Sequence, residues 1–277
     1  MTIEKIPLVA VLGSPVAHSK SPILHGFWLE KSGTKGLYIP MDVMTKDLET
    51  VLQAMPSMGF VGANVTLPHK EKVLSIADHI SDRAALIGAA NTLVFQADGK
   101  IYADNTDGYG FIENIRQYAP TWKASGGQAL VLGAGGAARA IVSALIEAGV
   151  PEVLIANRTR SRAEQIQSDF GARVNVVEWV KIGTEIQYVH TLVNTTSLGM
   201  TGKPEMNISL DGLKPETLVT DLVYTPLETE FLKAARNKGC TVVDGLGMLI
   251  HQAVPGFERW FGHKPTVDQT VRDILIS

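Results

Sequence analysis

Three short stretches in the first half of the chain carry more polar chemistry than packing requires. The first, HSKSP at 18–22, places the hydroxyls of Ser19 and Ser21 ahead of a predicted helix with Pro22 at its first position. A serine followed by proline is a common helix cap, but two hydroxyls at a helix N-terminus can also bind a carboxylate. The local sequence leaves both interpretations open.

The second stretch, NVTLPHK at 64–70, leaves a predicted strand and turns at Pro68. It is expected to deliver Lys70 to the beginning of a helix, where a cation opposes the helix dipole and therefore indicates a requirement other than stability. A lysine ammonium is already protonated near neutral pH, so it can act as a proton donor without large tuning.

Amide and carboxylate side chains stand where further strands begin or end. Asn91 and Thr92 open one predicted strand, and Asp107 lies in NTDGYG at 105–110, before a predicted helix. Aspartate is a common N-cap, so the position of Asp107 alone favours that structural role.

The second half contains a glycine-rich turn, VLGAGGAARA at 131–140, in which Gly133, Gly135 and Ala138 have the G-x-G-x-x-A spacing. Gly133 permits a tight turn, Gly135 lets the backbone approach a pyrophosphate, and Ala138 allows close packing of helix on strand. The N-terminus of the following helix attracts the diphosphate charge. The pattern predicts a dinucleotide site, and the alternative is a βα turn without ligand.

The next predicted strand ends in NRTRSR at 157–162, where an NAD-binding unit usually carries an acid. A carboxylate would repel a 2′-phosphate, whereas Arg158 and Arg162 can grip one through paired, charge-assisted hydrogen bonds. Two such bonds, at roughly 1.5–3 kcal/mol each, predict about two to four decades of preference for NADP over NAD. Thr159 adds either a hydroxyl contact or a cap for the next helix. The alternative for the whole cluster is a solvated helix start.

Short β-branched runs alternate with longer amphipathic stretches, and these are the elements that must position the polar residues. In the first half of the chain, the pattern predicts strands at 8–12, 37–41, 62–66, 91–95 and 100–104 and helices beginning near Ser21, Thr45, His69 and Asp107. A turn at 97–99 joins the last two of these strands into an antiparallel hairpin.

A polar stretch at 118–127 leads into a second α/β series. Its strands are expected at 129–132, 152–156, 173–177, 190–194, 218–222 and 240–244, and helical stretches follow at about 247–260 and 267–276. The predicted fold class is α/β with two α/β domains. The first has a mostly parallel sheet with one antiparallel hairpin, and the second has a Rossmann-like, doubly wound parallel sheet.

Composition limits the partners. The 277 residues are 45% hydrophobic, and the formal net charge of −3 argues against a nucleic-acid or membrane-surface partner. The single cysteine, Cys240, excludes an internal disulfide and a cysteine-based zinc cluster, and we expect no metal site. The first residues lack the features of a signal peptide, so we expect a cytoplasmic protein. Monomer and homodimer both remain open.

Motifs along nearly the whole chain resemble those of shikimate dehydrogenases. In chain order they are HSKSP, NVTLPHK, GAANT, NTDGYG, GAGGAAR, NRT with Arg162, NTTSLGM at 194–200, DLVYTP at 221–226 and GLGMLIHQA at 245–253. The resemblance implies an NADP-dependent oxidoreductase that acts on a CH–OH group. It would reversibly reduce 3-dehydroshikimate to shikimate, in the shikimate pathway of aromatic amino-acid biosynthesis.

The resemblance also assigns roles to residues. It implies that Lys70 is the catalytic acid/base, paired with Asp107, and that both contact the substrate. It implies that Ser19, Ser21 and Tyr224 hold the substrate carboxylate. The resemblance further implies that the ring hydroxyls of the substrate are held by Asn64, Thr66, Asn91 and Gln252, or that these residues support the contact with the hydroxyls.

The predicted cofactor-binding residues combine the glycine-rich turn with the family's motifs: Asp82, Gly133, Ala134, Gly135, Gly136, Ala137, Asn157, Arg158, Thr159, Arg162, Thr196, Leu222, Gly245 and Met248. Helix capping is an equal explanation for Asp82, and core packing is the alternative for Met248. The predicted domains are a substrate-binding domain at 1–106, an NADP-binding domain at 107–244 and helices at 245–277 that return to the first domain.

Two other functions remain open, and one is rejected. A quinate/shikimate dehydrogenase that uses NAD would tend to carry an acid near the 2′-hydroxyl, and a non-catalytic sensor of NADP or shikimate would not need Lys70 and Asp107. A glutamyl-tRNA reductase needs a cysteine nucleophile in its N-terminal domain, whereas Cys240 follows the nucleotide unit.

Overall fold

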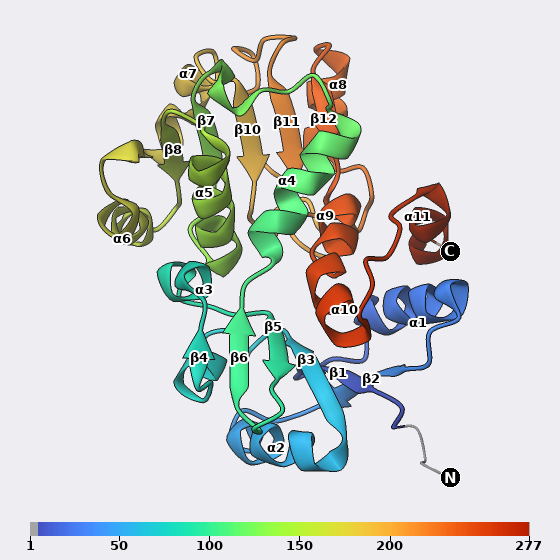
Figure 1. Cartoon of the computed structure of the whole chain (residues 1–277). Coiled ribbons are helices and arrows are strands. Elements are labelled where there is room, and N and C mark those ends of the chain that lie inside the picture. Colours follow the sequence, from blue (N-terminus) through green and yellow to red (C-terminus); the bar gives the residue numbers. More distant parts are fainter. Residues whose placement is uncertain (1–4, 277) are drawn as a thin grey trace. The chain divides into compact units, whose positions relative to one another are not determined.

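The computed structural model describes residues 5–276, which form two compact α/β units (Figure 1). The first unit contains residues 5–106 and 250–276, and the second contains residues 107–249. Residues 1–4, part of the segment that argued against a signal peptide, lie outside the described residues.

The first unit is built on a mixed sheet. Its strands are β1 (Leu8–Gly13), β2 (Leu37–Asp42), β3 (Phe60–Val65), β4 (His79–Ile80), β5 (Thr92–Phe95) and β6 (Ile101–Asp104), in the order β2-β1-β3-β5-β6-β4. The predicted hairpin is β5–β6, and β5 also runs antiparallel to β3, while the other pairs are parallel. The two-residue strand β4 was not predicted.

Short helices connect the strands in the N-terminal part of this unit. They are α1 (Ser21–Ser32), α2 (Leu48–Ala54) and α3 (Asp82–Ile87), with 3-10 turns η1 (Met55–Met58) and η2 (Lys72–Ser75). The prediction of a helix beginning near His69 is wrong. The carbonyl of Lys70 accepts the N–H of Ala90 at 2.8 Å, so it is used by a distant segment rather than by a helical turn.

The C-terminal part of the first unit contains α10 (Val254–Phe261) and α11 (Gln269–Ile276). The predicted single helix at 247–260 is instead α9 (Gly245–His251) followed by α10, because Pro255 in the first turn of α10 lacks the N–H that a continuous helix would use. The indole of Trp260 donates to the carbonyl of Leu93 at 2.8 Å. A Cβ at Gly62 would lie 2.0 Å from the indole nitrogen, so the close approach of α10 to the sheet requires glycine there.

An aromatic cluster fills the space beneath α10. The ring of His25 stacks on Tyr38 with centroids 4.0 Å apart, and it also contacts Trp28, Phe257 and Trp260. Complete burial lowers the pKa of His25 to about 3, so the imidazole is neutral and packs as an aromatic side chain.

The second unit has an entirely parallel sheet. Its strands are β7 (Ala129–Leu132), β8 (Val153–Ala156), β9 (Val174–Val177), β10 (Thr191–Asn194), β11 (Leu218–Asp221) and β12 (Thr241–Val243), in the order β12-β11-β10-β7-β8-β9. Read from β9, this is the doubly wound dinucleotide-binding order. The predicted fold class is therefore confirmed in both units.

Helices cover both faces of this sheet, as its continuous hydrophobic strands require. They are α4 (Asp107–Tyr118), α5 (Gly136–Ala148), α6 (Arg160–Phe170), α7 (Ile182–Glu185) and α8 (Glu230–Asn237), with 3-10 turns η3 (Ala124–Gly126), η4 (Gly171–Arg173) and η5 (Trp179–Lys181). Alternate residues of β7 face opposite sides, since Val131 packs with Ile141 of α5 while Leu130 packs with Phe231 of α8.

Candidate functional site

The predicted site residues are divided between the two units. The first unit carries Ser19, Ser21, Asn64, Thr66, Lys70, Asp82, Asn91 and Gln252. The second carries Asp107, Tyr224 and all the remaining predicted cofactor-binding residues.

The two serines at the start of α1 do not form the predicted cap. Helix α1 begins at Ser21, but its N-cap residue, Lys20, makes no side-chain cap hydrogen bond. The hydroxyl oxygen of Ser19 accepts the N–H of Ser21 at 3.3 Å, and the Ser21 hydroxyl is hydrogen-bonded to Tyr38. Both serines therefore contribute polar groups at this end of α1. Helix capping does not account for the Ser21 hydroxyl, because that hydroxyl is bonded to Tyr38.

Tyr38 links Ser21 to Asn64 and was missed by the sequence analysis. Its hydroxyl donates to Oδ1 of Asn64 at 2.6 Å, while Nδ2 of Asn64 donates to the carbonyl of Asn91 at 2.9 Å. Because that carbonyl can only accept, the carboxamide of Asn64 has one possible orientation. The signal for Tyr38 was weak: it is the one buried position of the otherwise exposed or half-buried edge strand β2.

Asn91 collects the polar ends of several strands. Its Oδ1 accepts the hydroxyl of Thr92 at 2.9 Å, and the N–H and hydroxyl of Thr106 at 2.9 and 3.0 Å. Its Nδ2 donates to Oε1 of Gln252 at 3.1 Å. The structure thus brings three predicted residues, Asn64, Asn91 and Gln252, into one hydrogen-bonded group. Three hydrogen bonds already occupy Oδ1 of Asn91, so this side chain could contact a substrate only as a hydrogen-bond donor.

Lys70 is half-buried in a turn that is held from both sides. The ring of neighbouring His69 donates from Nε2 to the carbonyl of Val43 at 2.7 Å, and the N–H of Thr66 donates to the carbonyl of Leu12 at 2.9 Å. The next element after Lys70 in the described chain is the short 3-10 turn η2 rather than the predicted α-helix, so the helix-dipole argument for this residue is wrong. Its candidacy depends instead on the family's motif.

The capping explanations for Asp82 and Asp107 are also corrected. Ser81, rather than Asp82, caps α3 by accepting the N–H of Ala84 at 3.1 Å. Asp82 is exposed in the first turn, where a carboxylate complements the helix dipole. Asp107 is the first residue of α4 rather than its N-cap, and it is buried.

The glycine-rich turn of the second unit has the geometry of a phosphate cradle. Gly133 has a φ of +111°, and a Cβ there would lie 2.6 Å from the hydroxyl oxygen of Thr195. A Cβ at Gly135 or Gly136 would meet no heavy atom within 4 Å, so the backbone at the start of α5 is open to a ligand. Helix α5 has no side-chain cap and no acid in its first turn, which leaves its N–H groups suited to an anion.

A buried hydrogen-bond group fixes the loop beside this turn. The carboxamide of Asn194 accepts the hydroxyl of Thr196 at 2.7 Å and donates to Asp221 at 2.9 Å. Asp221 also accepts the hydroxyl of Thr229 at 2.8 Å. The neighbouring Gly245 packs so closely that a Cβ would lie 2.3 Å from the carbonyl oxygen of Leu222.

The three arginines after β8 are in different environments. Arg160 pairs with Glu164 at 2.7 Å and with Glu178 at 3.4 Å. Arg158 and Arg162 are exposed, and neither has an ion-pair partner among residues 5–276. Thr159 is the N-cap of α6 but forms no side-chain cap, and the Nδ2 of Asn157 donates to its carbonyl at 2.8 Å. Two unpaired cations therefore remain at the place predicted for a 2′-phosphate.

Two further predicted residues of the second unit are partly buried. Burial raises the pKa of Tyr224 above its ordinary value, which keeps the phenol protonated. Met248 packs against the hydrophobic cluster that contains Phe111 and Ile115. Core packing is therefore at least one of its roles.

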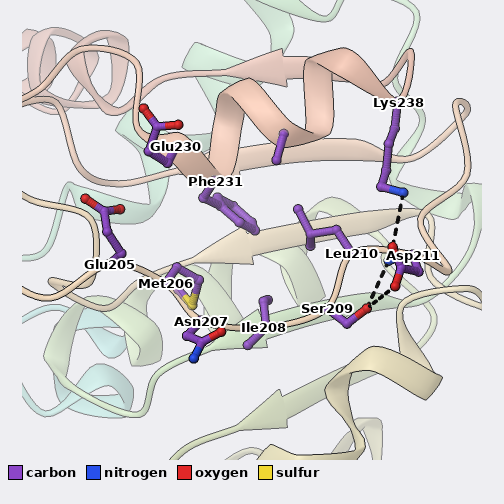
Figure 2. A pocket seen from close by; sticks show the side chains of 11 residues that line it. Glu205, Met206, Asn207, Ile208, Ser209, Leu210, Asp211, Glu230, Phe231 and Lys238 are labelled. Atoms are coloured by element: carbon purple, nitrogen blue, oxygen red, sulfur yellow. Dashed lines mark hydrogen bonds and ion pairs between the residues drawn. The ribbon is translucent and has the colours of Figure 1, made fainter.

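A separate hollow of about 630 Å³ lies between residues 205–211 and helix α8 (Figure 2). None of the predicted site residues lines it. Apolar Met206 and Phe231 share its wall with the carboxylates of Glu205 and Glu230, and no side chain that lines it is both buried and unpartnered. The hollow is not part of the predicted site.

Comparison with known proteins agrees with these features. Residues 11–93 match the family described as "Shikimate dehydrogenase substrate binding domain", residues 116–207 match "Shikimate / quinate 5-dehydrogenase", and residues 245–271 match "Shikimate 5'-dehydrogenase C-terminal domain". A Roseobacter denitrificans protein named shikimate dehydrogenase (NADP(+)) is 62% identical over 277 residues, covering 100% of both chains. The chain belongs to the shikimate dehydrogenase family.

Solved structures of this family and its relatives have the same fold. Quinate dehydrogenase from Corynebacterium glutamicum, in complex with NAD, gives a TM-score of 0.90 at 33% identity over 98% of both chains. Shikimate 5-dehydrogenase from Thermus thermophilus, in complex with NADP(H) and shikimate, gives 0.85 at 37% identity over 98% of both chains. The fold alone therefore does not choose between the two substrates.

None of the helices in the described part of the chain has the length and apolarity of a membrane-spanning segment.

The environment of Asp221 gives this family member a testable pH dependence. Burial raises the pKa of Asp221 to about 6 from 3.8, although Val223, Thr229 and Asn194 donate hydrogen bonds to it. Between these two values the unfolded carboxyl is ionised and the folded one is protonated, so the free energy of unfolding falls as the pH rises. Relative to Asp221→Asn, wild-type stability should fall by roughly 2–3 kcal/mol from about pH 4 to about pH 7.

Denaturant unfolding of both proteins at intervals across that range measures the difference directly. The Asn variant keeps the shape of the side chain and removes its titration. A difference between the two proteins that stays constant with pH would contradict the buried, proton-binding state of Asp221.

Proposed function

We propose that this protein catalyses the reversible, NADPH-dependent reduction of 3-dehydroshikimate to shikimate, a step of the shikimate pathway. The observation that carries the proposal is the pair of unpaired guanidinium groups, Arg158 and Arg162, after β8 in a chain that matches NADP(+)-dependent relatives over its full length. Such a pair suits a 2′-phosphate and disfavours an NAD-specific site.

The residues of the second unit fit the cofactor. The open backbone at Gly135 and Gly136 and the uncapped start of α5 would hold the diphosphate, and the loop at Thr196 would lie beside it. Bound NADPH supplies the hydride for the reduction. We further propose that Asn157, Thr159, Leu222, Gly245 and Met248 contribute to this site, as the family's motifs imply.

The residues of the first unit fit a polyhydroxylated carboxylate. Ser19 and Ser21, with Tyr224, would hold the carboxylate, while Asn64 and Asn91 would address ring hydroxyls. The bonds inside the protein leave Asn64 one lone pair on Oδ1 and occupy the carboxamide oxygen of Asn91, so Asn91 would contact a substrate only as a donor. Together the two amides can meet groups that both donate and accept, as hydroxyls do.

Lys70 is proposed as the proton donor. When a ketone is reduced, negative charge grows on its oxygen, and an ammonium at that oxygen both stabilises the charge and delivers the proton. Asp107 would orient the ammonium and accept a hydrogen bond from a substrate hydroxyl. In the oxidative direction, Lys70 must first lose its proton, so oxidation should speed up at alkaline pH.

An NAD-dependent quinate dehydrogenase is the second candidate, because a relative with that substrate shares the fold. A steady-state assay of 3-dehydroshikimate and 3-dehydroquinate, each with NADPH and with NADH, separates the two. We expect the highest kcat/KM for 3-dehydroshikimate with NADPH. A ratio of kcat/KM for NADPH over NADH below one, or a preference for 3-dehydroquinate, would overturn the proposal. Turnover by the purified protein alone also excludes a purely sensory role.

The cofactor preference should depend on two of the three arginines. Arg158→Ala and Arg162→Ala should each lower the ratio of kcat/KM for NADPH over NADH by about ten- to a hundredfold, because each removes charge-assisted hydrogen bonds to the phosphate. Arg160→Ala is the matched control, since this guanidinium is already engaged by Glu164 and Glu178. An equal effect of all three variants would mean that the cluster acts only through its net charge.

Removal of the proposed acid should affect the chemical step. Lys70→Ala should lower kcat by about 10²–10⁴-fold and abolish the alkaline rise of the oxidative rate. Lys72→Ala, two residues further along and exposed, serves as the control and should behave like the wild type. A Lys70 variant with near-normal kcat would remove this residue from the mechanism.

A further inference from the structure

The most heavily engaged carboxylate of the first unit is Asp104, the last residue of β6. Its side chain is fully buried, and it accepts hydrogen bonds from the Ser81 hydroxyl at 2.7 Å and the Asn105 N–H at 2.8 Å. Arg83 contacts both carboxylate oxygens, at 3.1 and 3.0 Å, and Arg259 lies 2.8 Å from Oδ2. These partners outweigh the burial, so the pKa of Asp104 lies below its ordinary value and the group is an anion.

The two arginines come from different parts of the chain. Arg83 belongs to α3, close to Asp104 in sequence, whereas Arg259 belongs to α10 in the C-terminal segment of the unit. The Arg259 guanidinium also lies 5.8 Å from the ring centroid of Tyr102. Because Arg83, Ser81 and Asn105 would still hold the carboxylate, Arg259 is not needed to neutralise it. Its contact adds a link between α10 and the sheet.

That link lies next to a substrate-site contact. Asp104 is the register partner of Thr92, and its carbonyl accepts the N–H of Asn91 at 3.0 Å. The side chain of Asn91 in turn donates to Gln252, which stands just before α10. The C-terminal segment therefore contacts two hydrogen-bonded neighbours, Asn91 and Asp104, through Gln252 and Arg259.

We propose that Arg259 is a positioning residue for Gln252. The indole of Trp260 fixes the approach of α10 to the sheet at Leu93, and the adjacent guanidinium fixes the rotation of the helix about that point. Rotation of α10 would move Gln252 relative to Asn91, which is itself held by Thr92 and Thr106. This inference rests on the proposed role of Gln252 in holding the substrate.

A double-mutant cycle tests the proposal in the full-length protein. Arg259→Ala should raise KM for shikimate about three- to tenfold, with kcat and KM for NADP within about twofold of the wild type. Arg259→Lys, which keeps the charge but not the planar fork, should give a smaller increase. In a Gln252→Ala background, Arg259→Ala should raise KM for shikimate no further, because the two residues act through one contact.

Lys31→Ala is the matched control. It removes another ion pair between the N-terminal and C-terminal parts of this unit, Lys31 with Asp268 at 2.7 Å, and should leave every KM unchanged. An unchanged KM in the Arg259 variants, or a multiplicative effect of the two substitutions in the cycle, would overturn the positioning role while wild-type turnover still supported the proposed function. Absence of wild-type turnover with shikimate would overturn both. Melting temperatures of all variants identify any loss of folding. If Arg259→Ala fails to fold, the KM of Arg259→Lys for shikimate decides whether Arg259 has the positioning role.

Discussion

The carboxamide of Asn91 is the constraint on which the polar structure of the first unit depends. Its oxygen accepts from Thr92 and Thr106, and its main-chain carbonyl accepts from the side chain of Asn64 and the N–H of Val65. A buried donor or acceptor without a partner costs about 1–3 kcal/mol, so each of these groups has in practice a single arrangement. Hydrogen bonds that stabilise the fold thereby also fix the orientation of the Asn64 and Asn91 carboxamides.

In the second unit, close packing of the backbone around glycines shapes the candidate site, whereas in the first unit hydrogen bonds do so. Gly133 must lack a side chain both because of its positive φ and because Thr195 occupies the space that a Cβ would need. Gly135 has no such neighbour, and its missing side chain leaves room on the outside of the turn. Two glycines in one motif thus serve opposite purposes: the first lets the protein pack on itself, and the second leaves the backbone exposed to a ligand.

The sequence predicted those features that depend on neighbours along the chain. All the expected strands are present within two residues of their predicted ends, because β-branched runs and glycine turns are local signals. Tyr38 and the Asp104–Arg259 pair were not predicted, since each acquires its role from residues far away in the sequence. Lys70 shows the limit of the local argument, because the argument assumed that a helix begins at this residue. In the structure the carbonyl of Lys70 instead accepts a hydrogen bond from the N–H of Ala90.

The arginines divide into those that contact a carboxylate of the protein and those that do not. Arg83, Arg160 and Arg259 each contact a carboxylate of the protein, whereas Arg158 and Arg162 have none in the described chain. Arg162 lies in the first turn of α6, where a cation is unfavourable by about 0.3–1 kcal/mol. The fold gains nothing from such a placement. An anion bound between the two guanidiniums would reverse the sign of that interaction, and the 2′-phosphate of NADP is an anion that the glycine-rich turn would bring to this end of β8.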